Sequence, residues 1–330
     1  MPFRAGHSFG RLSLPSTPII AGTPRVGDTA IVTQSGAPAI NYTRFIGGIA
    51  QNTITLPYTY IAADIGPLFS LVANGVGGHS SESNRIQFTS LSQLNVAPRA
   101  LYDRQNLTLV SSSHISSQGD SSGNSLTSLT QGTDSSRPTF GTAYINGVPG
   151  IQYSAQALVS GPTVAQLLSD PTKIWMLVPI EIVNNGPEVT SASTGYKGAT
   201  IMASTDNELS LKLGLISGAP KVLFTGTGAT LAWAAADVGI SGTHLIRARK
   251  TGTTAGVIVD GATEATAVVD SSISPTNGTL QTGTTAGSLS SLSAIVGDIA
   301  IWPQAPSAND ISTASAFYAY LYSSPESSWL

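Results

Sequence analysis

The feature that most constrains this sequence is a pair of β-rich segments joined by a two-residue turn. Thr139–Ile145 is rich in Thr, Phe, Tyr and Ile, which are residue types that favour strands. Asn146 and Gly147 follow, and both tolerate the positive φ that a tight hairpin turn requires. Alternation then resumes, with Ile151 and Tyr153 on one face of the next segment. The sequence therefore predicts an antiparallel hairpin at the centre of a β protein.

Composition supports an all-β fold across the chain. Only 10% of the 330 residues are charged, 41% are hydrophobic, and Gly numbers 34. Ordinary apolar content with a net charge of -3 excludes a disordered chain, and the length favours two domains. The same charge argues against nucleic-acid binding, which requires basic residues to neutralise phosphates. Cysteine is absent, so neither domain depends on disulfides.

The chain also lacks the apolar segments that export or membrane insertion would require. Its first residues contain no apolar run of the length of a signal-peptide core. No stretch of about 18 apolar residues occurs elsewhere, so no membrane insertion is expected. If the protein works outside the cell, incorporation into a virion released by lysis is one route.

Residues 16–91 predict a small β-sandwich, with short strand-like segments between Gly and Pro turn signals. Tyr58–Ile61 and Arg85–Thr89 are among the expected strands. The segment resembles the bacterial and phage immunoglobulin-like (Ig-like) repeat, and the matching residues are Tyr60, Asp64, Gly66, Phe69, Val72, Asn74, Gly78 and Ser83. The usual Trp of the third strand is missing, so Phe45 or Tyr42 must fill that part of the core. Asp64 is expected to accept local backbone hydrogen bonds at a corner, which is a structural role.

Residues 100–330 resemble the concanavalin A-like (laminin-G-like) jelly rolls that are common in phage structural proteins and secreted carbohydrate-binding proteins. The phrase RPTF…INGVPGIQYS of the hairpin carries this resemblance, together with ALYD, where Tyr102 stands in place of the usual Trp. The resemblance also includes the turn GDSSGN, the paired segments THLIRARK and GVIVDG, and the closing phrase GDIAIW…YAYLY. Residues 92–99 are expected to form a linker, and residues 1–15 an N-terminal arm.

One helix is expected, near the C-terminus, over Pro306–Tyr322. Ser307 is a suitable N-cap, and Asp310 lies near the positive end of the helix dipole. Apolar residues at helical spacing would pack on the sandwich; they are Ile311, Ala314, Tyr318 and Leu321. The predicted fold class is therefore all-β: an N-terminal Ig-like β-sandwich followed by a concanavalin A-like jelly roll with one C-terminal helix.

Catalytic patterns are not found in the sequence. The four His residues are scattered, without the spacing of a zinc site. Glycoside hydrolysis requires a pair of facing carboxyl groups, but Glu181 stands alone on its predicted strand. Asp206 and Glu208 share a face beside a turn, where solvated edge charge is the expected role. The protein is therefore predicted not to be an enzyme.

Glycan binding remains compatible with the residues present, because sugars are held by aromatic faces and a few hydrogen-bonding groups. The candidate glycan-binding residues are Tyr144, Asn146, Asn184, Asn185, Tyr196 and Trp233. Trp175 and Trp302 lie in strand-like apolar runs and are expected in the core. No cofactor is expected, although Asp120 in GDSSGN is a candidate for calcium; the alternative is an Asx-turn that only shapes its loop.

The hypothesis is a non-catalytic spike or fibre component of a virion or gene-transfer particle, located on the particle surface, that binds host cell-surface polysaccharide. The arm would dock on other virion proteins, with Phe3, Arg4, Phe9 and Arg11 as candidate anchors. Weak single sites would require a homo-oligomer such as a trimer, or many copies per particle. The alternatives are a glycan depolymerase on the same jelly roll and a bacterial surface adhesin.

Overall fold

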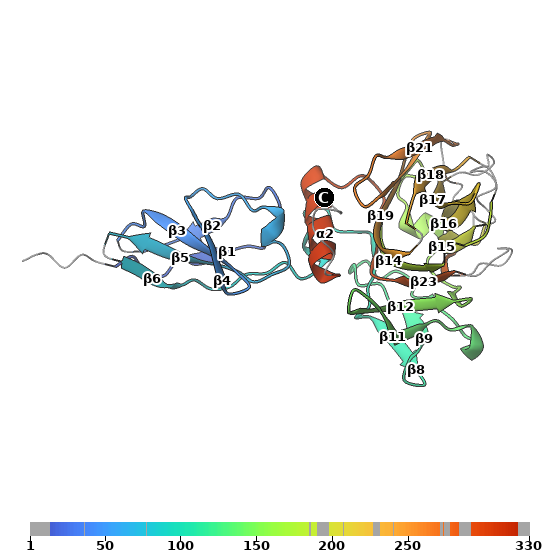
Figure 1. The fold of residues 1–330 in the computed structure, drawn as a ribbon, viewed down its shortest axis with the longest axis horizontal. Helices are drawn as coiled ribbons and strands as arrows, with labels where there is room; N and C mark the ends of the chain where they lie inside the picture. The colour runs from blue at the N-terminus through green and yellow to red at the C-terminus, as the bar shows by residue number, and fades with distance from the viewer. Residues whose placement is uncertain are drawn as a thin grey trace, which may run out of the picture. The chain divides into compact units, whose positions relative to one another are not determined.

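The computed structural model describes residues 14–322 except positions 36, 77, 185, 190–197, 207, 227–231, 240, 271–272, 274–277 and 284–291. The chain divides into two compact units, residues 1–93 and 94–330 (Figure 1). The candidate arm residues Phe3, Arg4, Phe9 and Arg11 lie outside the described residues. Among the residues that are described, no helix is long and apolar enough to span a membrane.

The N-terminal unit consists of a two-stranded and a four-stranded antiparallel sheet. The strands are β1 (Ile19–Ala21), β2 (Ile31–Thr33), β3 (Asn41–Ile46), β4 (Ile49–Ile54), β5 (Phe69–Gly75) and β6 (Gly78–Glu82), with the larger sheet in the order β4-β3-β5-β6. Buried residues from both sheets share one core, which includes Ile20, Tyr42, Tyr60, Phe69 and Leu71. Tyr42, one of the two residues predicted to replace the missing Trp, is thus in the core.

Asp64 is the polar centre of this unit and is fully buried. Its carboxylate accepts hydrogen bonds from Arg44 Nη1 (2.9 Å), the Tyr58 hydroxyl (2.7 Å) and the Ile61 backbone N–H (2.9 Å). Burial raises the pKa of Asp64, whereas these hydrogen bonds and the Arg44 charge act in the opposite direction. The corner residue noted in the sequence therefore joins a strand, a turn and an aromatic side chain.

Two segments expected to be strands in this unit are not. Tyr58–Ile61 and Arg85–Thr89 each make only a single bridge, Thr29 with Thr59 and Phe69 with Ile86. In the first, the Ile61 N–H is directed to the Asp64 carboxylate, and a 3₁₀ turn follows at Ala62–Asp64, so a regular ladder cannot continue.

The second unit consists of two large antiparallel sheets. The first has twelve strands: β7 (Ala100–Tyr102), β8 (Leu107–Val110), β9 (His114–Gln118), β10 (Leu129–Thr130), β11 (Thr139–Ile145), β12 (Val148–Ser154), β14 (Lys173–Asn184), β19 (Gly242–Thr251), β20 (Thr254–Val259), β21 (Ala265–Val268), β23 (Ser293–Val296) and β24 (Ile299–Trp302). Its central order is β12-β23-β14-β19-β20.

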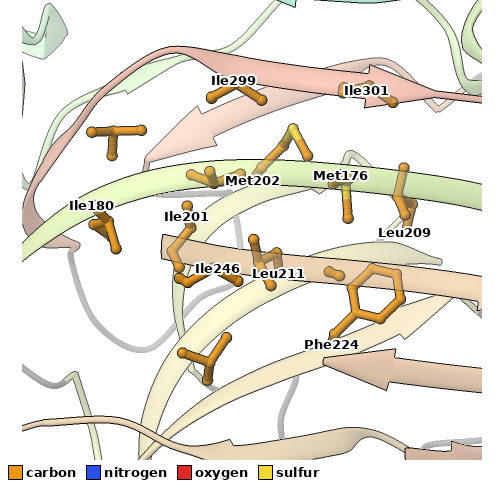
Figure 2. Close-up of a cluster of buried hydrophobic side chains, with 14 of the residues drawn as sticks. Met176, Ile180, Ile201, Met202, Leu209, Leu211, Phe224, Ile246, Ile299 and Ile301 are labelled. Carbon is orange, nitrogen blue, oxygen red and sulfur yellow. The ribbon is translucent and has the colours of Figure 1, made fainter. Parts of the chain in front are cut away.

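The second sheet has six strands in the order β13-β22-β15-β16-β17-β18. They are β13 (Ala157–Leu158), β22 (Leu280–Gly283), β15 (Ala199–Ser204), β16 (Leu209–Ile216), β17 (Ala219–Gly226) and β18 (Ala234–Asp237). Side chains of both sheets form one core: Figure 2 shows Met176 and Ile180 of β14 and Ile246 of β19 near Leu211 of β16 and Phe224 of β17. The result is a two-sheet β-sandwich.

The predicted hairpin is confirmed as β11 and β12. Tyr144 pairs with Pro149 and Ile145 with Val148, across a turn in which Asn146 has φ 46° and Gly147 φ 87°. The Ser-, Gly- and Asn-rich segment that follows residue 110 contains two short strands, β9 and β10. Ile115 of β9 and Leu129 of β10 are fully buried, so each strand places an apolar side chain in the core.

The predicted C-terminal helix is confirmed as α2 (Ala308–Leu321), capped by the Ser307 hydroxyl, which accepts from the Asp310 N–H. Its end is held by Asp298. The Tyr318 hydroxyl donates to the Asp298 carbonyl (3.0 Å), and the Asp298 N–H donates to the Tyr322 hydroxyl (2.9 Å). A short additional helix, α1 (Val164–Leu167), was not expected. The predicted fold class, all-β with a C-terminal helix, is confirmed.

Candidate binding site beside the C-terminal helix

The residues predicted to bind glycan do not form one site. Tyr144 is half exposed on β11 and Asn146 lies in the exposed turn after it. Asn184 is exposed at the end of β14, where it pairs with Ser293 and, across β23, lies level with Ser154. The partner of Tyr144 is five positions away from Ser154 along β12, which corresponds to about 16 Å. Asn185 and Tyr196 lie outside the described residues.

Trp233 is a core residue, which corrects its assignment as a glycan platform. It is 5% exposed and packs with Val189 and Leu223 in a small hydrophobic cluster. Lys212, fully buried, places its ammonium group 5.7 Å from the centre of the indole ring, and burial lowers the pKa of this lysine to about 8. A ring covered in this way has no free face on which a sugar could stack.

The Asp120 carboxylate shapes its own loop. It accepts hydrogen bonds from the backbone N–H groups of Leu101 (3.0 Å), Ser122 (3.0 Å) and Leu126 (3.3 Å) and from the Ser122 hydroxyl (2.7 Å). These contacts match the Asx-turn alternative. In the described part of the chain, no group of three His, Cys, Asp or Glu side chains could hold a metal ion.

A different set of residues converges on the outward face of the twelve-stranded sheet. Met176, Val178 and Ile180 of β14 point into the core, so Trp175 and Leu177, at the alternate positions, point outward. The strand pairing places Trp175 opposite Arg249 of β19 and Leu177 opposite Arg247. On its other side, Trp175 is paired with Trp302 of β24.

Helix α2 covers part of this face (Figure 1). Asp310 in its first turn fixes the preceding chain by accepting from the N–H groups of Asn95 (2.9 Å) and Val96 (3.3 Å), while the Trp302 indole N–H donates to the Val96 carbonyl (2.8 Å). Apolar residues therefore face a helix on one side of β14 and a second sheet on the other. This explains why its sequence, KIWMLVPIEIV, is nearly continuously apolar.

Between the helix and the sheet lies a hollow, named here the Trp175–Arg247 groove. Its lining residues are Trp175, Met176, Leu177, Arg247, Trp302, Pro306, Asp310, Ile311 and Ala314. The empty volume is about 260 Å³ including the open mouth, and the enclosed part has room for a group the size of one water molecule. It is thus an indole-floored groove with one cation on its wall.

Two hydrogen-bond donors of the groove lack acceptors. The Trp175 Nε1 atom is buried and has no hydrogen-bond partner. Arg247 makes no hydrogen bond or ion pair with any described residue, and burial lowers the pKa of its guanidinium, with Glu264 acting in the opposite direction. Glu264 is engaged by Arg249, whose Nε and Nη2 donate to its two oxygens at 2.5 and 2.6 Å. The accessible lining of the groove is nevertheless apolar, so the groove offers indole and aliphatic surface to a ligand.

Sequence reasoning missed this site for two reasons. Trp175 was expected in the core because its strand is apolar, and it is indeed half-buried, but on the outward face. Arg247 was read only as part of a strand. The available signal was the alternation in HLIRARK, which places Arg247 and Arg249 on the same face of one strand.

No protein-family model matches the sequence, and no curated protein sequence matches it. Solved structures that partly resemble this chain include the binding domain of a botulinum neurotoxin serotype D/C, with a TM-score of 0.43 and 12% identity; the match covers 70% of this chain and 54% of that one. Domain 4 of a GH43 extracellular arabinanase from Geobacillus stearothermophilus, in complex with arabinotriose, has a TM-score of 0.39 and 11% identity, over 67% of this chain and 97% of that one.

A third similar structure is tailspike protein 2 from an Escherichia coli O157:H7 bacteriophage, with a TM-score of 0.38 and 14% identity. The match covers 56% of this chain and 26% of the tailspike. This chain thus spans about half the length of the neurotoxin domain and a quarter of the tailspike. Likeness at this level carries no information on function, so the site itself must supply the argument.

Proposed function

We propose that this protein is a non-catalytic attachment protein on the surface of a virion or gene-transfer particle, and that residues 94–330 bind a host cell-surface glycan. The observation that carries the proposal is the Trp175–Arg247 groove. It presents apolar surface of the half-buried Trp175 indole between the sheet and helix α2, beside the Arg247 side chain. Aromatic surface with a few well-placed polar groups is the usual composition of a small-ligand site, and sugars supply both the apolar ring face and the oxygens.

The carboxylates nearest the groove support binding rather than hydrolysis. A glycosidase requires one carboxyl group as acid and a second as nucleophile or base. Asp310 lines the groove, but its oxygens accept from two backbone N–H groups and the Ser307 hydroxyl. Glu264 is held at both oxygens by Arg249. Neither group is placed to act on a bound sugar.

The particle assignment rests on the sequence. Residues 1–15 carry Phe3, Arg4, Phe9 and Arg11 without enough apolar content to fold alone, so we propose that they dock on other virion proteins. Several copies, such as a trimer, would be needed because linking weak sites raises avidity by about 10²–10⁴-fold. No nucleic-acid contact is proposed, since the net charge is -3.

The first test separates binding from hydrolysis. The full chain is incubated with a panel of purified bacterial surface polysaccharides, and both retention of the protein and release of reducing ends are measured. We expect retention by at least one polysaccharide without new reducing ends, and loss of retention when Trp175 is replaced by Ala. Trp233→Ala, which alters a tryptophan of the core, controls for general loss of stability. Reducing ends that accumulate with time would show a depolymerase and overturn the proposal.

A further inference from the structure

We propose that this protein associates with further copies of itself through one end of its N-terminal unit. This end, named here the apolar tip, is where β5 passes into β6 (Figure 1). Its exposed residues are Leu14, Pro38, Ile40 and Val76. The inference rests on the proposed function, which requires several copies per particle, and it adds the surface that joins them.

Segments that are distant in the sequence meet at the apolar tip. The Ile40 backbone N–H donates to the Asn74 carbonyl at 2.7 Å, so the residue before β3 lies beside the end of β5. Val76 follows β5 directly, in the turn that leads to β6. A β-carbon at Gly75 would lie 3.6 Å from the Pro38 carbonyl oxygen, so Pro38 is close to the same turn. These residues therefore share one end of the unit.

The first described residues of the chain complete the apolar tip. A β-carbon at Gly75 would lie 3.1 Å from the Pro15 ring. A β-carbon at Gly78 would lie 3.0 Å from a methyl carbon of Leu14. Glycine has no side chain, which is what allows the chain to approach this closely. Leu14 thus packs directly on the β5–β6 hairpin and belongs to the same surface as Val76.

Three large apolar side chains of the tip are mostly exposed. The exposed fraction is 58% for Leu14, 64% for Ile40 and 74% for Val76. Single residues of this kind are ordinary on a protein surface, but a group of them that meets in one place indicates an interaction site. Association would remove these side chains from water, and we expect this burial to be the driving force.

The distribution of charge indicates that the partner is a second copy. Residues 14–93 contain three arginines and three acidic residues, and each is paired within the unit. The pairs are Arg25 with Asp28, Arg44 with Asp64, and Arg85 with Glu82. None of them belongs to the tip. Copies that meet through the same surface bring identical groups together, so a surface without charge avoids repulsion. A different protein is usually selected by complementary charge, which the tip does not offer.

An acidic partner protein is the alternative, because of the residues that precede Leu14. Residues 1–13 carry Arg4 and Arg11 and no acidic side chain. These arginines would attract an acidic surface, whereas in neighbouring copies of this chain they would repel each other. Salt screens such charges, with a Debye length of about 10 Å at 0.1 M and about 3 Å at 1 M. Raising the salt concentration should therefore strengthen self-association or leave it unchanged.

Analytical ultracentrifugation of the full chain tests the inference. Sedimentation is measured from about 1 to about 100 μM protein, at low and at high NaCl concentration. We expect an oligomer at the highest protein concentration, with a dissociation constant that salt does not increase. The double variant Ile40→Ser, Val76→Ser should raise the dissociation constant at least about 10-fold, because it removes two large apolar side chains from the centre of the interface.

Ile49→Ser is the matched control. Ile49 is 67% exposed, much like Ile40, but it pairs with Ile46 at the opposite end of β3. Its replacement should change the dissociation constant by less than about 2-fold. Thermal unfolding of each variant, followed by fluorescence, confirms that lost association is not lost folding.

A single cysteine locates the contact. The chain contains no cysteine, so Val76→Cys introduces the only thiol. Its reaction with an excess of a maleimide dye should slow as the protein concentration is raised from about 1 to about 100 μM, because association covers the tip. The thiol of Ile49→Cys should react at the same rate throughout.

The outcomes separate this inference from the proposed function. A chain that stays monomeric at about 100 μM, or association that weakens at high salt, would overturn self-association through the apolar tip. So would a double variant that associates as tightly as the unchanged chain. Each of these results leaves glycan binding by the second unit in place. A chain that associates through the tip but is retained by no polysaccharide of the panel would instead overturn the proposed function.

Discussion

Replacing Arg104 with Met should lower the free energy of unfolding of the second unit by about 3 to 5 kcal/mol at pH 7. Arg104 Nη1 lies 2.9 Å from the carboxylate of Asp298, and the Arg104 backbone N–H donates to the other oxygen at 2.9 Å. Both side chains are largely buried. Without the guanidinium, the buried carboxyl group would either stay ionised with no cation or take up a proton, and the anchor of Tyr318 and Tyr322 of α2 would weaken.

The stability that Arg104→Met loses should depend on pH, and the pKa of Asp298 determines the direction of that dependence. Burial raises the pKa of Asp298 to about 6, against the effect of Arg104, which lowers it. A carboxyl group with a raised pKa contributes stability that is fully present below its unfolded pKa of about 4 and is lost as the pH rises through its folded pKa. In Arg104→Met the pKa rises further, so the deficit should be largest near pH 8 and smaller near pH 5.

The loss of stability at each pH can be measured by urea unfolding of the full chain, followed by tryptophan fluorescence. The double variant Arg104→Met, Asp298→Asn removes the buried charge as well and should recover much of the lost stability at pH 7, because uncompensated charge is the main cost. A deficit that stays constant between pH 5 and pH 8, or a double variant less stable than Arg104→Met, would contradict the explanation.

Replacing Asp64 with Ala should destabilise the N-terminal unit by about 3 to 5 kcal/mol. The change leaves three donors without their acceptor, namely Arg44 Nη1, the Tyr58 hydroxyl and the Ile61 N–H. Arg44 Nε already has no partner, so the guanidinium would be buried with little compensation. The loss is large compared with the total stability of a domain, so this unit should unfold under conditions that leave the second unit intact.

Hydrogen exchange of the full chain, resolved by peptide, gives the location as well as the size of the effect. Peptides from β3 and β5 should lose protection in Asp64→Ala, while peptides from β14 and β19 should not change. Asp28→Ala is the matched control: Asp28 pairs with Arg25 at 3.3 Å in a more exposed position, where an ion pair contributes about 0 to 1 kcal/mol. Equal loss of protection in both variants would contradict a specific role for Asp64.

Local signals in the sequence identified the parts of the fold that depend on neighbouring residues. The Asn146-Gly147 turn is a two-residue hairpin because both residues tolerate positive φ, and no distant contact is needed to favour it. Ser307 caps α2 through an N–H three residues away, which is likewise a local interaction. Asp64 was placed in a structural role from its position at a corner, and its hydrogen bonds to Ile61 and Tyr58 are within a few residues.

The candidate site could not be predicted from local sequence signals. Trp175 and Arg247 are far apart in the sequence and meet because β14 pairs with β19, while the neighbour of Trp175 on the other side is Trp302 of β24. An apolar run does not show which of its faces meets the core and which meets a helix, so Trp175 was expected inside. In the same way, the sequence around Trp233 gave no sign that this side chain is buried beside Lys212.

By itself, the sequence determined the β-rich class, the central hairpin and the C-terminal helix of this protein, because residue propensity, turn chemistry and capping act over a few residues. Only the tertiary structure decided which side chains share a surface. Strand order and register bring distant positions together, as with Leu177 and Arg247, and burial then decides whether a donor finds an acceptor. One example is Glu264, whose two oxygens accept from Arg249 and not from Arg247 on the same strand.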